Sequence, residues 1–271
     1  IAMPSSFGMW FSAYAELLID DMVMLNAAQK IVDQNPLGSA AGYGSSFPID
    51  RTFTTQELGF SILKYNSVAA QMSRGKAEKT VSFAFSGLAA TLSKLAMDVC
   101  LYMSQNFNFI SLPNHLTTGS SIMPHKKNPD VFELIRAKCN KIQALPYEIT
   151  LLTNNLPSGY HRDFQLLKEG LFPAIQNLKS CLEIACFSLK DIQVNTTILD
   201  DKKYDYLFTV DNLNELVQQG IPFRDAYKII ATQIEDGNYE PSKKTLHTHE
   251  GSINNLCLEE IVLKMESFLR Y

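Results

Sequence analysis

The apolar positions of this chain have the spacing of long amphipathic helices. The clearest case lies between residues 78 and 106, where apolar side chains stand alternately three and four residues apart. The members of this stripe are Val81, Phe85, Leu88, Leu92, Leu95, Val99 and Tyr102. A helix over that stretch would be about 40 Å long, at a rise of about 1.5 Å per residue. The stretches 7–32, 135–152 and 167–189 show the same spacing.

Helices of this length must lie side by side, because a single helix buries little of its apolar stripe. The sequence therefore predicts an all-α fold, with a long-helix bundle over residues 1–195. Pro146 and Pro173 fall inside two of the predicted helices and should kink them. Beyond Asp191 only shorter helices are predicted, and we assign them to a small helical C-terminal domain over residues 196–271.

Three polar connections join the predicted helices, and all three contain Gly, Ser or Pro. They are residues 36–54, 106–129 and 156–162. The first two are longer than an ordinary connection between helices. Connections of that length are typically functional or disordered, so these segments are the first places to look for chemistry.

Composition narrows the range of partners. The chain has 271 residues, 46% of them apolar, and a formal net charge of -4. That charge argues against nucleic acid as the main partner, because phosphate binding needs a basic surface. No apolar run approaches the roughly 20 residues that span a bilayer, and no signal peptide is visible. We expect a soluble protein with no membrane partner, and a homo-oligomer, since helices with several apolar faces are natural where subunits associate.

The five cysteines show no C-x-x-C spacing, and four of them lie in predicted helices. Reduced thiols in the protein core are therefore expected, and the reducing cytoplasm is the expected compartment. No group of His and Cys residues has ligand spacing, so no metal site is predicted. The chain opens at Ile1, without an initiator Met, which predicts that it is part of a longer polypeptide.

Candidate chemistry is concentrated in residues 117–129. Gly119 begins a flexible segment with two serines, and two lysines and an amide follow. Asn128 suits a helix N-cap and Pro129 the first helical position. Hydroxyl, cationic and amide groups delivered at a helix N-terminus could bind an anion. The residues alone leave the alternative of a solvated loop with an ordinary helix cap.

Residues 119–129 resemble the G-S-S-x-M-P-x-K-x-N-P motif of the fumarase/aspartase superfamily. The resemblance implies that Ser120 is the base that removes a Cβ proton from a succinyl group, which then collapses to fumarate. It also implies that Lys126 and Asn128 hold a carboxylate and spread its developing charge, with Ser121 as a neighbouring substrate contact. A serine needs nearby positive charge and aimed backbone dipoles to become basic. Further implications are a homotetramer whose sites draw on three subunits, and no metal or organic cofactor.

Two other segments resemble the argininosuccinate lyase family in particular. Residues 36–51 are similar to its P-L-G…F-P-I-D-R stretch, in which Arg51 is either a structural residue or a substrate ligand. The other segment is similar to the family's Y-N-[KR]-D-x-Q-x-x-K element, and its matched substrate contacts are Tyr160, Gln165 and Lys168. His161 replaces the usual Asn of that element. The implied reaction eliminates fumarate from argininosuccinate to give arginine, a step of arginine biosynthesis.

Two family elements are not found in the chain. Residues 2–4 resemble the end of a T-H-x-Q-x-A-x-P element whose Thr-His pair would precede Ile1, and no S-R-N-D element is present. The chain alone is therefore expected to have an incomplete active site and to be inactive. Three alternatives stay open: an adenylosuccinate lyase, whose loop often has the His found at position 125; a non-catalytic, crystallin-like structural homologue; and a helical interaction module.

Overall fold

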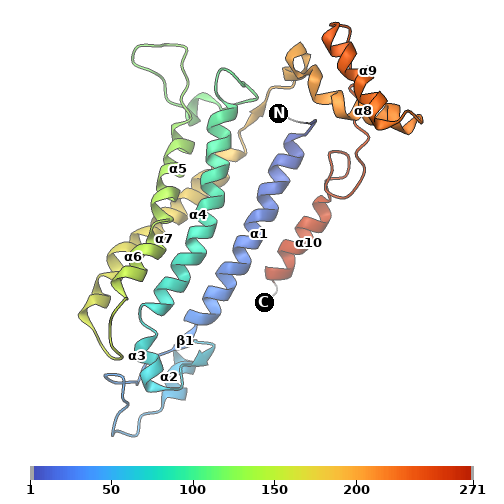
Figure 1. The fold of residues 1–271 in the computed structure, drawn as a ribbon. Helices are drawn as coiled ribbons and strands as arrows, with labels where there is room; N and C mark the ends of the chain where they lie inside the picture. The colour runs from blue at the N-terminus through green and yellow to red at the C-terminus, as the bar shows by residue number, and fades with distance from the viewer. Residues whose placement is uncertain (1–2, 270–271) are drawn as a thin grey trace. The chain divides into compact units, whose positions relative to one another are not determined.

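The computed structural model describes residues 3–269, which form two compact units (Figure 1). One unit is Leu17–Gln193, and the other comprises the residues from Val194 onward together with those up to Glu16. The domain limits predicted from the sequence, 1–195 and 196–271, stay a prediction. Ala2, where the predicted T-H-x-Q-x-A-x-P resemblance begins, lies outside the described residues, as do the outermost ends of both predicted domains.

A bundle of long helices makes up the unit Leu17–Gln193. Its members are α4 (Lys76–Tyr102), α5 (Asp130–Ile142), α6 (Leu145–Leu152) and α7 (Leu167–Leu189), with the greater part of α1 (Phe7–Val32). Helix α4 lies against α5, α6 and α7, and α7 also contacts α5 and α6. The predicted all-α, long-helix fold is confirmed.

The predicted apolar stripe of α4 is the centre of this bundle. Leu88, Leu92, Leu95 and Val99 are all buried, the last completely. By length and composition alone α4 could cross a membrane. Its apolar stripe is, however, buried against α5, α6 and α7, which is typical of the core helix of a bundle. The helix begins at a turn in which the backbone amide of Gly75 donates to the Glu78 carboxylate at 2.7 Å.

The stretch 135–152 is not the single kinked helix that the sequence predicted. Helix α5 ends at Ile142, and a new helix, α6, begins at Leu145 with Pro146 in its first turn. A proline has no amide to donate to the preceding turn, whereas the first turn of a helix needs no such bond. Pro173, in contrast, lies inside a continuous α7, as predicted.

Short elements lie at one end of the bundle. They are β1 (Gln34–Asn35), α2 (Arg51–Glu57), β2 (Ile62–Leu63) and α3 (Ser67–Met72), and β1 pairs in parallel with β2. The side chain of Asn35 is fully buried and donates to the Thr55 hydroxyl at 2.9 Å. A buried amide with a hydroxyl partner holds this part of the chain in one arrangement. The bundle's other short elements are β3 (Ile110–Ser111), η1 (Asn114–Leu116) and η2 (Arg162–Gln165).

The second unit contains shorter elements, as the sequence predicted. After β4 (Gln193–Val194) they are η3 (Ile198–Asp200), η4 (Lys202–Phe208), α8 (Thr209–Gln218), α9 (Phe223–Glu235) and α10 (Leu258–Leu269). Leu213, Ala226 and Ile230 form the core between α8 and α9. The segment that follows α9 returns to α8, where His247 Nε2 lies 2.6 Å from Asp211 Oδ1.

Candidate active site

The segment 117–129 is a loop closed at its neck. Thr118 and Asn128 form an isolated antiparallel bridge, with the Thr118 amide donating to the Asn128 carbonyl at 3.2 Å and the reverse bond at 2.8 Å. The Thr118 hydroxyl also donates to the Asp130 carboxylate. Asn128 was predicted to cap helix α5, and this was wrong by one residue, because the N-cap is Pro129. The bridge holds the backbone of Asn128 in extended pairing, so the helix begins after it.

Ser120 lies half-buried at the start of the loop, with its hydroxyl oxygen turned toward the backbone. That oxygen accepts hydrogen bonds from the amides of Ile122, at 3.3 Å, and Met123, at 3.1 Å. Two amide dipoles aimed at one oxygen stabilise negative charge on it. The arrangement therefore favours the alkoxide form that a serine base requires.

The other predicted site residues of the loop are Ser121, Lys126 and Asn128. The amide of the Asn128 side chain donates to the carbonyls of Thr118, at 3.3 Å, and Gly119, at 3.5 Å. Lys126 and Ser121 are exposed, and Lys126 forms none of the ion pairs present among residues 3–269. In this structure the amide of Asn128 is thus directed at the loop itself, and the Lys126 cation is free to meet a ligand.

The second predicted element, residues 156–168, leads into α7. Its chain turns at Gly159, forms η2 and enters the helix at Leu167. Gln165 Nε2 donates to the Tyr160 hydroxyl at 3.1 Å, so two of the three predicted contact residues meet directly. Lys168 is exposed in the first turn of α7. Phe164, which is buried, anchors the element.

His161, which replaces the family's Asn, has a structural contact. Its Nε2 lies 2.7 Å from the carbonyl oxygen of Pro157 and its ring meets Phe164 edge-on. Arg51, for which the sequence left two interpretations, donates to the carbonyls of Leu37, Lys64 and Tyr65 at 2.7 to 2.8 Å. Both side chains hold backbone in place.

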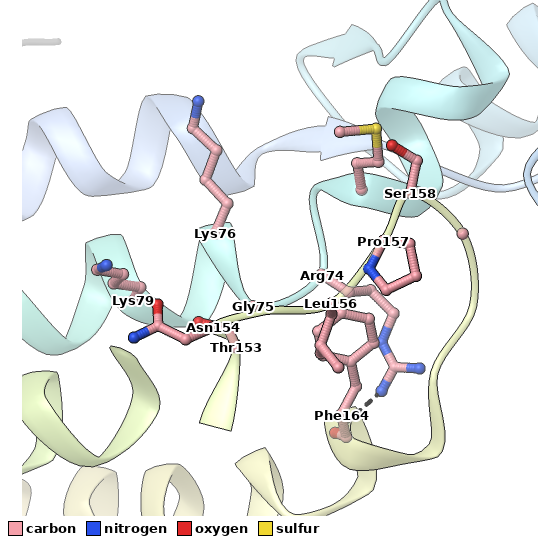
Figure 2. Close-up of a pocket in the computed structure, with 12 residues that line it drawn as sticks. Arg74, Gly75, Lys76, Lys79, Thr153, Asn154, Leu156, Pro157, Ser158 and Phe164 are labelled. Atoms are coloured by element: carbon pink, nitrogen blue, oxygen red, sulfur yellow. Dashed lines mark hydrogen bonds between the residues drawn. The ribbon is translucent and has the colours of Figure 1, made fainter. Parts of the chain in front are cut away.

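A cavity of about 340 Å³ adjoins the second element (Figure 2). Among the residues that line it are Arg74, Lys76, Lys79, Asn154, Ser158 and Phe164. None of the three cations Arg74, Lys76 and Lys79 was predicted from the sequence. Arg74 lies in the turn before α4, and Lys76 and Lys79 lie in the first turn of that helix. In the sequence, only the short S-R-G-K stretch over residues 73–76 marks this turn.

The two predicted elements lie at opposite ends of the bundle. The loop with Ser120 precedes α5, and the element with Tyr160 follows α6, so both helices separate them (Figure 1). The residues from 130 to 152 extend about 35 Å at about 1.5 Å per residue. Ser120 and Tyr160 of one chain therefore cannot contact the same small molecule.

The buried thiols do not add a reactive group. Burial is the main cause that raises the pKa of Cys139 to about 12, and burial also raises the pKa of Cys181. A thiol with a raised pKa is a poor nucleophile at neutral pH. Among residues 3–269, no three His, Cys, Asp or Glu side chains are grouped so that they could hold a metal ion.

Comparison with known proteins identifies relatives along the whole chain. The argininosuccinate lyase of Parabacteroides distasonis is 60% identical over 269 residues, which is 99% of this chain and 60% of that protein. The argininosuccinate lyase of Bacteroides fragilis is 59% identical over 266 residues, again 60% of its length. The chain thus spans about 60% of the length of the curated relatives it matches.

Solved structures show the same fold at low sequence identity. EDDS lyase in complex with formate superimposes with a TM-score of 0.78 at 20% identity, over 99% of this chain and 61% of that one. The class II fumarase of Schistosoma mansoni gives a TM-score of 0.72 at 19% identity, over 99% and 58%.

A family model described as "Lyase" matches residues 1–144. Together with the argininosuccinate lyase relatives, this match confirms the predicted kinship with the fumarase/aspartase superfamily. Because the match covers more than half of the 271 residues, the chain belongs to the lyase family.

Proposed function

We propose that this chain supplies two parts of the active site of an argininosuccinate lyase, which eliminates fumarate from argininosuccinate and leaves arginine. The observation that carries the proposal is the Ser120 hydroxyl, held by two backbone amides within the G-S-S-I-M-P segment. The identity of about 60% with argininosuccinate lyases supports the choice of substrate.

In the proposed reaction, Ser120 as an alkoxide takes the proton from the succinyl carbon next to the one that bears the guanidino nitrogen. The electron pair moves into the neighbouring carboxylate and gives a doubly charged aci-form. When that pair returns, the carbon–nitrogen bond breaks and fumarate leaves; the guanidino nitrogen takes a proton from water, and Ser120 gives up the carbon-derived proton to solvent. Lys126 and Asn128 hold the carboxylate while its charge grows, which is electrostatic stabilisation of the transition state. Proton transfer and charge stabilisation suffice for these steps, so the proposal includes no cofactor.

Binding of Asn128 to substrate requires a change in the loop. Its side-chain amide now donates to the carbonyls of Thr118 and Gly119. A substrate carboxylate would replace these carbonyls as the stronger, charged acceptor. Ser121, exposed beside the base, would contact the same end of the substrate.

At the other end of the bundle, Tyr160, Gln165 and Lys168 would bind the argininosuccinate. A phenol, an amide and a cation suit a zwitterionic ligand with several carboxylates. The contact between Tyr160 and Gln165 supports their action as a unit.

Because these two groups lie at opposite ends of one bundle, the proposal requires several copies of the chain in one assembly. We propose a homotetramer in which different subunits supply the Ser120 loop and the Tyr160 element to each site. Large exposed apolar side chains on the bundle helices support association; they include Phe83, Met97, Leu134, Phe172 and Phe187. The cytoplasm is the proposed location.

The test is fumarate release by the complete protein, followed by ultraviolet absorbance, with argininosuccinate and adenylosuccinate offered in parallel. We expect turnover of argininosuccinate only. Preference for the purine substrate would establish the adenylosuccinate alternative, which His125 in the loop favours. Absence of turnover with both substrates would leave the crystallin-like alternative.

A further inference from the structure

The turn between α3 and α4 reaches the Tyr160 element although it lies far away in the sequence. Gly75 ends this turn with a positive φ of 80°. A Cβ atom on Gly75 would lie 2.5 Å from Thr153 Cγ2 and 3.3 Å from Phe164 Cε1. Because the backbone of Gly75 lies this close to Phe164, the preceding residue, Arg74, also lies beside the Tyr160 element.

Arg74 makes three contacts with the element. Its Nη2 donates to the carbonyl oxygen of Phe164 at 3.2 Å, a bond between residues ninety positions apart (Figure 2). The guanidinium carbon lies 5.4 Å from the centroid of the Phe164 ring and 6.0 Å from that of the Tyr160 ring. These are distances at which a cation and an aromatic ring attract one another.

The charge of Arg74 is directed at these rings. Within the part of the chain that the structure describes, no carboxylate forms an ion pair with Arg74. Phe164 is buried and would remain anchored without the cation. Tyr160, in contrast, is 51% exposed and follows the unusual backbone of Gly159, so fewer contacts fix its ring.

We propose that Arg74 is a positioning residue that holds the Tyr160–Gln165 pair in the orientation that binds substrate. The guanidinium fixes the backbone at Phe164 and the face of the Tyr160 ring, and the Tyr160 hydroxyl in turn receives the amide of Gln165. Arg74 thus acts through Tyr160 without touching the substrate. The inference rests on the proposed function for its substrate and on contacts of the chain itself for its geometry.

The experiment compares Arg74→Met, Arg74→Lys and a control, Lys76→Met, in the complete protein. Lys76 lines the same cavity, but its side chain points away from the element (Figure 2). Amide hydrogen exchange of residues 156–168 gives a readout that is independent of activity. We expect faster exchange in Arg74→Met, partial recovery in Arg74→Lys, and no change in the control. Unchanged exchange in Arg74→Met would overturn the proposal.

Kinetics test the link to substrate. Loss of a cation–aromatic contact and a hydrogen bond should raise KM for argininosuccinate about tenfold and leave kcat nearly unchanged. In the double variant with Tyr160→Phe, the two losses should not multiply, because Arg74 acts through Tyr160. Independent effects, or a loss confined to kcat, would overturn the positioning role. If the unaltered protein releases no fumarate, the proposed function itself fails, and hydrogen exchange alone decides whether Arg74 orders the element.

Discussion

The backbone amide of Met123 donates to the hydroxyl oxygen of Ser120 at 3.1 Å, so the donor of that bond belongs to the main chain. A main-chain donor is kept in every substitution except one to proline, and its dipole needs no reorganisation when charge develops. The same two residues lie in a loop whose neck is closed by Thr118 and Asn128. The hydroxyl is therefore held by the backbone geometry of the loop.

Replacing Ser120 by Ala in the complete protein should lower kcat by about a thousandfold or more, because the base is removed. Thermal unfolding should change little, since the side chain is only half-buried. Ser121→Ala is the matched control, with an expected loss of less than about tenfold. Retained turnover in Ser120→Ala would reject the assignment of the base.

Mixed assemblies test the separation of the two elements. Subunits with Ser120→Ala and subunits with Tyr160→Phe should each have low activity alone. After the two are unfolded together and reassembled, activity should be recovered, because some active sites then contain an intact Ser120 loop from one chain and an intact Tyr160 element from another. Ser120→Ala mixed with Asn128→Ala should recover none, since both changes lie in the same loop. Fumarate release measured across a series of mixing ratios distinguishes the outcomes, and equal behaviour of the two mixtures would contradict the proposed sharing.

The present chain by itself is predicted to release no fumarate from argininosuccinate, whereas the complete protein should. The reason is chemical: two of the family's elements are not found among its 271 residues. Assays with equal concentrations of both proteins check this, and measurable turnover by the chain alone would show that those elements are dispensable.

Gly75→Ala should destabilise the bundle by about 2 to 4 kcal/mol, from a strained φ and an overpacked contact with Thr153. Gly59 provides the control, because its φ is also positive, at 72°, but a Cβ there would meet nothing within 4 Å. Gly59→Ala should cost only the strain, about 1 to 2 kcal/mol. Denaturant unfolding of both variants gives the difference, and equal losses would contradict the contact argument.

Asp21 makes stability depend on pH. Its side chain is buried, and burial raises the pKa of its carboxyl above the ordinary value of 3.8, against an opposing effect of a hydrogen bond with Thr91. A carboxyl with a raised pKa favours folding while it is protonated, and this contribution is lost as pH rises through the folded-state pKa. Asp21→Asn should therefore raise Tm at pH 7, and the gain should shrink toward pH 4. The exposed neighbour Asp20, changed to Asn, should show a smaller gain; equal gains would contradict the role of burial.

The helical bundle could be predicted because its information is local. The spacing of Leu88, Leu92, Leu95 and Val99 repeats within a single helix, so no distant partner is needed to recognise it. The start of α5 was misplaced by one residue, because it depends on the backbone bridge between Thr118 and Asn128, which are far apart within the loop.

The role of Arg74 had no local signal at all. Its carbonyl partner is ninety residues away, and only folding brings the two together. The opposite positions of the Ser120 loop and the Tyr160 element, in contrast, were implied by the helical stretch predicted between them, although the break between α5 and α6 was not. The motifs identified which residues carry chemistry, and the tertiary structure determined which of them can meet.

In the proposed assembly, a bundle with one functional group at each end would contribute to two different active sites. A chain with a defective Ser120 loop would inactivate one site and would still supply an intact Tyr160 element to another. Mixed populations of sound and faulty chains would thus lose output unevenly, according to which end is damaged and how many chains carry the defect.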